Sequence, residues 1–213
     1  MNISIQQFTF GPFQENTFIL YDENKNTLII DPGCYTSSEQ LKLLDFIQKN
    51  ELKPQRLLNT HCHVDHIAGN RFIFDQFGLR PWFHKNELPV FENQKAVSDM
   101  YGLPCDPSPE PEGFLQEKEF ISIGTHKLDV IFTPGHSPGH LVFYHVLQKF
   151  LINGDVLFNG SIGRTDLPLG NHELLLKSIK EKLFILPDET TVFCGHGPET
   201  SIGHEKKHNP FLV

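Results

Sequence analysis

Runs of apolar residues, continuous or alternating with polar ones, predict β-strands in both halves of the chain. The runs over 3–8, 16–21 and 27–31 are rich in Ile, Phe and Thr, which are typical of strands. A polar segment, DENKN, lies between the second and third runs and predicts a hairpin loop. Further strands are expected over 56–60, 120–124, 127–133, 141–146, 150–154 and 191–195.

Apolar residues at helical spacing predict helices between these strands. The expected helices cover about 38–49, 65–78, 87–101 and 171–186. The first has Thr36 or Ser37 as an N-cap, with Glu39 or Gln40 three residues further on. The second helix ends at Gly78 and the third stops at Gly102, because glycine is a natural C-terminal stop. Before the first helix, Asp31-Pro32-Gly33 predicts a type II turn.

The order of these elements indicates the fold class. Strands followed by helices in each half predict an α/β chain with two similar halves, in which helices cover the sheets. The chain has 213 residues, and we expect a single domain over 1–213. Residues 102–113, GLPCDPSPEPEG, contain four prolines and are expected to form an extended loop rather than a linker between domains.

Charge and composition exclude several classes of protein. The net charge of −8 disfavours nucleic acid and acidic membrane surfaces as partners. No segment approaches the roughly 20 apolar residues of a membrane helix, and the N-terminus does not resemble a signal peptide, so we expect a cytoplasmic protein. The cysteines are widely spaced and are expected to be reduced thiols. They are Cys34, Cys62, Cys105 and Cys194.

The segment NTHCHVDHIAGN (59–70) places His61, His63, Asp65 and His66 within six positions. His61 and His63 are two residues apart, so both rings point to one side of an extended segment. Asp65 and His66 come where the chain turns into a helix and can point elsewhere. One loop can therefore serve two neighbouring metal positions. Without a metal, such crowded polar groups would remain unpaired at a considerable cost in free energy.

Other potential ligands also follow predicted strands. His136, Asp155 and His196 each lie one to three residues beyond a strand, where active-site groups of sheet-based folds gather. Asp155 is also compatible with a simple turn. The predicted arrangement has one metal bound by three imidazoles, a second metal bound by a mixed set, and Asp155 between them. The first set is His61, His63 and His136, and the second is Asp65, His66 and His196.

Together these segments resemble the metallo-β-lactamase superfamily over nearly the whole chain. HCHVDH, TPGHSPGH around His136, NGDVLF around Asp155 and CGHGPET around His196 are similar, in order, to its metal-ligand motifs, and Asp31 of IIDPG to its early aspartate. The resemblance implies an αββα sandwich with the metal site at one edge of the sheets. Asp155 argues against a true β-lactamase, because the best-known lactamase branch has cysteine there.

Two further segments are similar to the compact, glyoxalase II-like branch of that superfamily. These are SIGRTDLPLGNH (161–172) and GHEKKHNPF (203–211). The branch hydrolyses glutathione thioesters to a hydroxy acid and glutathione. Larger glyoxalases II grip glutathione with a helical C-terminal extension. This sequence continues for 17 residues after His196, so those glutathione contacts are not carried over.

The implied chemistry is attack of a metal-bound hydroxide on the carbonyl of a small thioester substrate. Two zinc ions are expected, with iron or manganese as alternatives, and Asp65 and Asp155 are the predicted catalytic carboxylates. Asp31 either orients a ligand imidazole or only shapes its turn. The number of subunits is left open.

Three further residues have two interpretations each. Arg164 forms an ion pair with Asp166 or contacts a substrate carboxylate. His140 is expected to pack or hydrogen-bond near His136. His172 reaches the pocket or merely begins a helix.

Two competing functions belong to other classes. A glutathione persulfide dioxygenase would hold one iron through His61, His136 and Asp155, and the remaining donors would bind nothing. A non-catalytic metal-binding module is the other alternative, although a site this rich in donors with open coordination is rarely inert.

Overall fold

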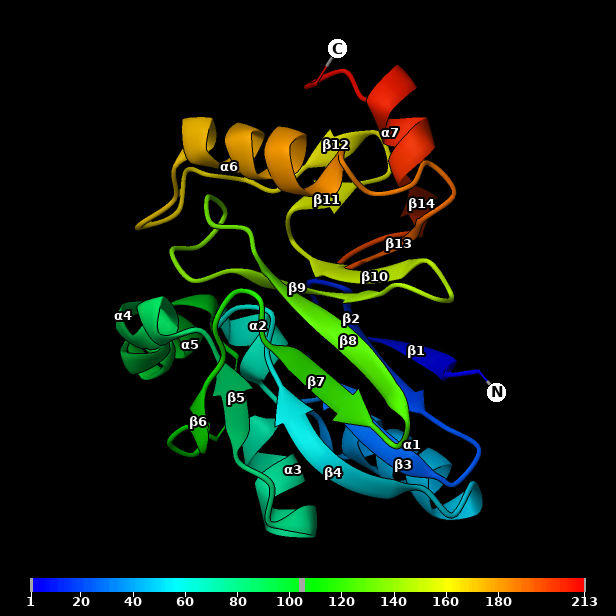
Figure 1. Cartoon of the computed structure of the whole chain (residues 1–213). Coiled ribbons are helices and arrows are strands. Elements are labelled where there is room, and N and C mark those ends of the chain that lie inside the picture. The colour runs from blue at the N-terminus through cyan, green and yellow to red at the C-terminus, as the bar shows by residue number, and fades with distance from the viewer. Residues whose placement is uncertain (1, 104–105, 213) are drawn as a thin grey trace.

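In the computed structural model, which describes residues 2–103 and 106–212, two six-stranded sheets pack face to face (Figure 1). The first sheet has the order β1 (Ser4–Phe10), β2 (Glu15–Tyr21), β3 (Asn26–Ile30), β4 (Lys53–Leu58), β5 (Pro81–Phe83) and β6 (Gly113–Phe114). The second has the order β14 (Thr200–Ser201), β13 (Thr191–Cys194), β10 (Phe150–Gly154), β9 (Leu141–His145), β8 (His126–Phe132) and β7 (Phe120–Ile123). A separate small hairpin is formed by β11 (Leu157–Phe158) and β12 (Ser161–Ile162).

Strand direction determines which loops meet. The β3–β4, β4–β5 and β5–β6 pairs are parallel, as is β10–β13, and the other pairs in the two large sheets are antiparallel. Since β8 and β10 are both antiparallel to β9, they run in the same direction. The carboxyl ends of β8, β10 and β13 therefore lie at one edge of the second sheet, and those of β3 and β4 lie together in the first.

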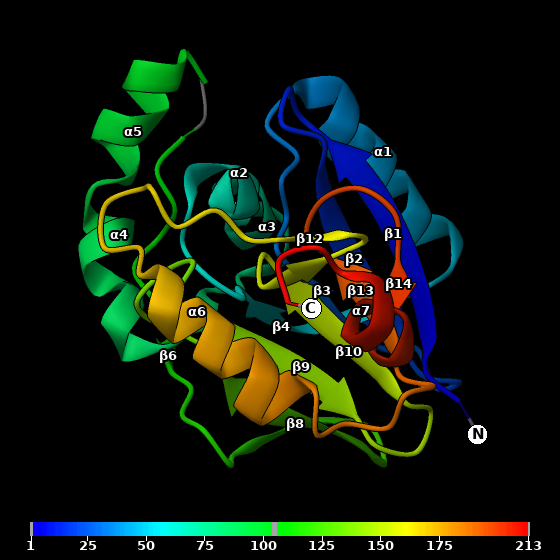
Figure 2. The ribbon, with the colours of Figure 1, turned by 90° about the horizontal axis from the view of Figure 1, so that it is seen from above.

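Helices cover the outer face of each sheet. The helical segments are α1 (Ser37–Lys49), α2 (Val64–Ile67), α3 (Asn70–Phe77), a 3-10 turn η1 (Lys85–Glu87), α4 (Leu88–Glu92), α5 (Gln94–Tyr101), α6 (His172–Ser178), a π-helical turn η2 (Ile179–Leu183) and α7 (Ile202–His208). Leu43 of α1 and Ile73 of α3 pack on the first sheet. Leu175 of α6 and Ile202 of α7 pack on the second, and both helices lie in front of it, toward the viewer, in Figure 2. The expected αββα sandwich is confirmed.

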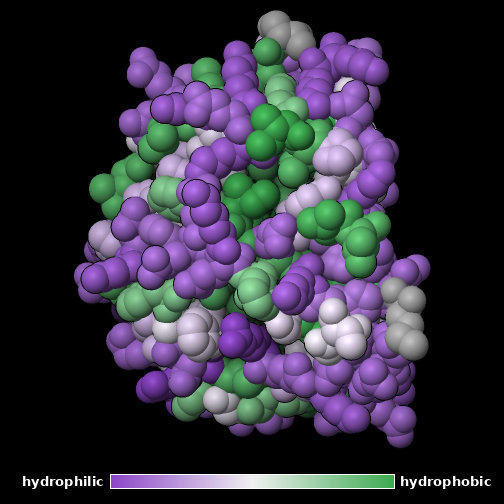
Figure 3. All heavy atoms as spheres, in the orientation of Figure 1, coloured by the Kyte–Doolittle hydropathy of each residue, from purple (hydrophilic) through white to green (hydrophobic). Residues whose placement is uncertain are grey.

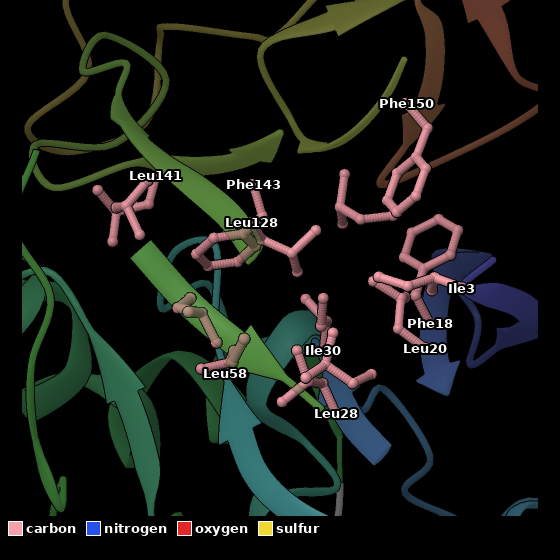
Figure 4. Close-up of a cluster of buried hydrophobic side chains, with 14 of the residues drawn as sticks. Ile3, Phe18, Leu20, Leu28, Ile30, Leu58, Leu128, Leu141, Phe143 and Phe150 are labelled. Carbon is pink, nitrogen blue, oxygen red and sulfur yellow. The ribbon is translucent and has the colours of Figure 1, made fainter. Parts of the chain in front are cut away.

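The central core lies between the sheets and follows the alternation of side chains along each strand. Phe18 and Leu20 of β2 point into it, together with Phe143 of β9 (Figure 4). The intervening Ile19 belongs to the cluster under α1 and α3 instead. Val142 of β9 likewise packs beneath α6. Strands buried on both faces explain why several runs are continuously apolar rather than alternating.

The expected helix over 65–78 is wrong as a continuous element, because it divides into α2 and α3 at Ala68-Gly69. The amide of Gly69 donates to the carbonyl of Pro32 at 2.6 Å. A Cβ at Gly69 would lie 2.7 Å from both that carbonyl and the Cys34 sulfur. This close approach to the preceding loop requires glycine and interrupts the helix.

The other long helices are also segmented. The expected helix over 87–101 comprises the end of η1, then α4 and α5, which are separated at Asn93. The Asn93 side chain donates to the carbonyl of Pro89 at 2.7 Å. The expected helix over 171–186 becomes α6 and η2, and the hydroxyl of Ser178 at their junction donates to the Pro134 carbonyl at 2.7 Å.

Several short elements had no sequence signal. The strands β5, β6, β11, β12 and β14 have two or three residues, too few to show alternation. In α7 the buried residues are Ile202, Gly203 and Glu205, which form no apolar stripe.

Other local expectations are confirmed. Thr36 and Glu39 form the capping box of α1, and Gly78 and Gly102 end α3 and α5 in the left-handed conformation. The described cysteines, Cys34, Cys62 and Cys194, are free and buried, whereas Cys105 lies outside the described residues. Part of the expected 102–113 loop, residues 104–105, also lies outside them.

The surface is mostly hydrophilic. Polar side chains cover most of the face seen in Figure 3, with hydrophobic ones showing between them. In the described part of the chain, no helix combines the length and the apolar character needed to cross a membrane.

Candidate metal centre

The predicted ligands lie on segments that follow strand ends, at the edge where the two sheets meet. After β4, the loop carries His61 and His63, and the short helix α2 carries Asp65 and His66. Residues that follow β8, β10 and β13 supply His136, Asp155 and His196, respectively. The amide of Leu141 at the start of β9 donates to the carbonyl of Thr60 at 2.8 Å, which joins the two sheets beside these loops.

A first cluster comprises His61, His63 and His136, which offer one nitrogen each within 4.8 Å of one another. Nε2 of His136 lies 3.3 Å from Nε2 of His61 and 2.9 Å from Nδ1 of His63. The far nitrogens of two rings have partners. Nδ1 of His61 is 3.0 Å from the Thr60 hydroxyl, and Nδ1 of His136 donates to the Arg164 carbonyl at 2.8 Å.

A second cluster comprises Asp65, His66 and His196, again within 4.8 Å. Nε2 of His196 lies 3.3 Å from Nε2 of His66 and 3.3 Å from a carboxylate oxygen of Asp65. Here too the far nitrogens are occupied. Nδ1 of His66 faces Asp31 at 3.1 Å, and Nδ1 of His196 donates to the Phe13 carbonyl at 2.9 Å.

Asp155 lies between the two clusters. Its Oδ1 is 3.4 Å from Nε2 of His66, and its Oδ2 is 3.5 Å from His136 and 3.4 Å from His196. Oδ1 is buried without a hydrogen-bond partner among the described residues. Gly195 makes this placement possible, since a Cβ there would lie 2.2 Å from Oδ1. The carboxylate is thus positioned to serve both clusters.

The donor arrangement fits bound cations. Neutral His66 and His196, each donating through Nδ1, would direct two lone pairs at each other across 3.3 Å. Protonated rings would instead place two positive charges at that distance. A cation held by these donors would remove either conflict and would also satisfy Oδ1 of Asp155. Imidazole and carboxylate donors at this spacing suit divalent transition metals such as zinc or iron.

The two clusters differ in electrostatics. Burial, followed by the neighbouring imidazole of His136, lowers the pKa of His63 to about 3. Burial of His196 by itself lowers its pKa, but hydrogen bonds to Asp155 and Asp65 outweigh this effect and raise the pKa to about 10. Burial also lowers the pKa of His66, but the negative charges of Asp155 and Asp65 outweigh it and raise this pKa well above its usual value. In the metal-free protein the second cluster therefore attracts positive charge.

Asp31 adjoins the second cluster and contacts the first through Thr60. Its carboxylate accepts the amide and the hydroxyl of Thr60 at 2.7 and 2.6 Å, and it lies 3.1 Å from Nδ1 of His66. The expected type II turn is wrong, because Asp31 itself has a left-handed φ of 49° and Gly33 has no positive φ. The bonds to Thr60 hold Asp31 in this unusual conformation.

His140 supports Asp155 from the protein interior. Its ring stacks on His61 with centroids 4.8 Å apart, and its Nε2 accepts the Asp155 amide at 3.1 Å. Burial lowers the pKa of His140, which keeps this nitrogen available as an acceptor.

The remaining expected residues lie outside both clusters. The Arg164 side chain is exposed and pairs with Asp166 through two contacts of 2.7 Å, so only its carbonyl touches a predicted ligand. His172 is exposed at the start of α6, with Nδ1 3.5 Å from the Thr165 hydroxyl. Cys62 turns away into an apolar cluster with Phe83 and Phe91, as its place between two ligands predicts.

Several residues beside the centre were not predicted from the sequence. The carbonyls of Phe13 and Arg164 fix two imidazoles, but a backbone acceptor has no sequence signature. Glu15 is fully buried, 3.9 Å from Nδ1 of His66, and burial raises its pKa. Asn16 and Glu87 are buried as well. A run of polar residues, Glu15 to Thr17, at the start of an apolar strand is the one signal that could have drawn attention to β2.

Comparison with known proteins places this centre in a family. The family model described as "Metallo-beta-lactamase superfamily" matches residues 10–196. The chain belongs to the metallo-β-lactamase superfamily. Membership, together with the His/Asp clusters, indicates a metal-dependent hydrolase that uses divalent metal ions.

Similar members of the superfamily extend over the whole chain. "Hydroxyacylglutathione hydrolase GloC" of Haemophilus influenzae is 38% identical, covering 100% of this chain and 98% of that protein. The structure described as "Crystal structure of BLEG-1 B3 metallo-beta-lactamase" is 38% identical with a TM-score of 0.90, covering 99% of this chain and 100% of that one. "Crystal structure of TTHA1623 in a di-iron-bound form" is 37% identical with a TM-score of 0.88, covering 97% and 100%.

Proposed function

We propose that this protein hydrolyses a small thioester of the hydroxyacylglutathione type at a centre that holds two divalent metal ions. The observation that carries the proposal is the pair of three-donor clusters with Asp155 between them. The similarity to the hydrolase of Haemophilus influenzae supports the substrate class. Zinc is the proposed metal, and the di-iron structure of a similar protein makes iron the main alternative.

The side chains of this protein have distinct tasks in the proposal. The metals supply Lewis acidity and lower the pKa of water, so that a nucleophile is available at neutral pH. His61, His63 and His136 would hold one ion, and Asp65, His66 and His196 the other. Asp155 would contact both, and its backbone is fixed by His140.

The leaving group explains why the chain needs no strong general acid at this centre. A thiol has a pKa near ~8.5, so it can depart as the thiolate at neutral pH. Asp31 would orient His66 through Nδ1, which leaves Nε2 for a metal.

Two other activities are alternative outcomes of the test. A mononuclear iron dioxygenase needs His61, His136 and Asp155, whereas the structure also brings His63, Asp65, His66 and His196 to the centre. β-Lactam hydrolysis is suggested by the similarity to BLEG-1, which is described as a B3 metallo-β-lactamase. The expectation that Asp155 argues against this activity remains a prediction.

The test combines elemental analysis of the purified protein with three assays. We expect two metal ions per chain and release of glutathione from S-lactoylglutathione. Replacement of His136 by Ala should abolish the release, whereas His172→Ala, outside both clusters, should retain it. Oxygen consumption with glutathione persulfide by a protein with one iron per chain would overturn the proposal. Hydrolysis of a cephalosporin without thioester hydrolysis would overturn it as well.

A further inference from the structure

Glu87 is a buried carboxylate that connects the two loops of the first cluster. It lies at the end of η1, and its side chain has no exposed surface. One oxygen accepts the amide of Cys62 at 2.8 Å, and the other accepts the amide of Gly139 at 2.6 Å. Cys62 lies between His61 and His63, whereas Gly139 belongs to the loop that carries His136. One side chain therefore fixes the separation of the two segments that supply all three imidazoles.

Gly139 shows that this contact depends on local shape. A Cβ at this position would lie 2.7 Å from the Glu87 amide nitrogen and 3.0 Å from the Glu87 carboxylate. The glycine thus allows the loop to approach closely enough to donate its N–H. Because backbone amides of two loops point at one carboxylate, its removal would leave two buried donors unpaired.

Asn16 has the corresponding position beside the second cluster. Its side-chain amide donates to the carbonyls of Cys194 at 3.0 Å and Gly197 at 2.9 Å, and its backbone amide donates to Gly195 at 2.7 Å. These three acceptors surround His196 in the sequence. Asn16 belongs to β2 of the first sheet, so it holds the His196 loop of the second sheet across the sandwich.

We propose that the two metal positions are set by separate positioning residues, Glu87 for the first cluster and Asn16 for the second. This inference rests on the two-metal centre of the proposed function. Neither side chain is a ligand; each acts through the backbone of the loops that carry ligands. The two positions can consequently be weakened one at a time, by substitutions that leave every ligand in place.

The experiment uses full-length variants that retain one position each. His196→Ala leaves the first position intact, and His63→Ala leaves the second. Glu87→Gln and Asn16→Ala are introduced separately into both proteins, and cobalt(II) is titrated into the metal-free forms with its visible absorption as the readout. The substitution of Glu87 is nearly isosteric, but its amide group can accept from only one of the two loops. Glu87→Asp, which is one methylene shorter, is the second variant at this position.

The chain offers matched controls in another buried pair. Glu205 has no exposed surface and accepts from the Gly160 amide at 3.1 Å and the Asn209 side chain at 2.7 Å. Asn209 is equally buried and also donates to the Ser161 carbonyl at 2.9 Å. Glu205→Gln and Asn209→Ala should reduce the thermal stability of the metal-free protein to a similar extent, but they lie outside the ligand loops.

The expected result is a crossed pattern, in which each substitution weakens metal binding at one position and spares the other. Glu87→Gln should weaken cobalt binding about tenfold to a hundredfold at the first position, as loss of an outer hydrogen-bond partner does. It should change binding at the second position by less than about twofold, as expected for independent sites. Asn16→Ala should do the reverse, and the control variants should affect neither position.

Several outcomes would overturn the inference. Equal weakening of both positions by either variant would show a general loss of structure, and effects no larger than those of the controls would show that Glu87 and Asn16 have no positioning role. A wild-type protein that binds a single cobalt ion would leave no second position to set. The proposed function is tested independently by the thioester assay. If the crossed pattern is found in a protein that does not hydrolyse thioesters, the positioning roles stand and the proposed substrate is wrong.

Discussion

The cluster of His61, His63 and His136 consists of imidazoles alone, whereas the cluster of Asp65, His66 and His196 contains a carboxylate and has Asp31 beside it. Burial and mutual repulsion keep the rings of the first cluster neutral, and the pKa of His63 is about 3. Carboxylates outweigh burial in the second, where the pKa of His196 is about 10.

This difference shows how one loop can prepare two unlike positions. An ion that enters the first cluster meets neutral imidazoles, so its binding releases no proton from a charged ring. An ion that enters the second must displace protons, but it gains the attraction of carboxylates. The difference in pKa between the clusters follows from the neighbours of each ring, because the five rings of the two clusters are all histidine imidazoles.

Replacement of Asp155, which faces both clusters, should remove the difference between the two metal positions. Asp155→Ala deletes the carboxylate that faces His66, His136 and His196. We expect both positions to lose metal and turnover to fall by more than the ~100-fold that loss of an outer partner costs. Elemental analysis and the thioester assay measure this. Retention of full activity would show that Asp155 does not bridge the ions.

Asp31→Asn should act mainly on the second position. The carboxylate contacts Nδ1 of His66 directly but reaches His61 only through the Thr60 hydroxyl. We expect zinc affinity at the second position to fall about tenfold to a hundredfold, with a smaller loss at the first. Competition with a chromophoric chelator measures both constants. Equal losses would mean that Asp31 holds the whole loop rather than one imidazole.

The pH dependence of metal binding should separate the positions further. In the metal-free protein His196 is protonated below about pH 10, so zinc must displace its proton throughout the neutral range. His63 is unprotonated above about pH 3, so zinc displaces no proton from it. Between pH 6 and 8, affinity at the second position should rise about tenfold per pH unit for each proton displaced. Affinity at the first should change far less, and parallel titrations at the two positions would contradict the contrast.

The smallest effect is expected from Arg164→Ala. His136 is bound to the carbonyl of Arg164, which every residue has, and the side chain pairs with Asp166 at the surface. Zinc affinity at the first position should therefore change by less than about twofold. An increase in KM for the thioester, with kcat unchanged, would assign the guanidinium to substrate binding. A loss of metal would instead show that the ion pair shapes the loop.

Much of the fold could be predicted because burial imposes a period on the sequence. Phe18 and Leu20 alternate with Ile19 between two cores, and such runs identify the long strands. Two glycines that adopt the left-handed conformation mark the ends of α3 and α5. The division at Gly69 could not be predicted, since it depends on the carbonyl of Pro32, which reaches this site only in the folded chain.

The types of donor present, and their places after strand ends, are readable from the residues alone, because ligand chemistry and strand periodicity are local properties. Which nitrogen of each ring faces the centre depends instead on how distant segments pack. The carbonyls of Phe13 and Arg164 engage Nδ1 of His196 and His136, and they come from distant segments. The same holds for the bonds to the ligand loops, where the partners of Glu87 lie at least 25 positions away and those of Asn16 at least 178. Hydrogen bonds between remote segments exist only where packing brings those segments together, so no local pattern encodes them.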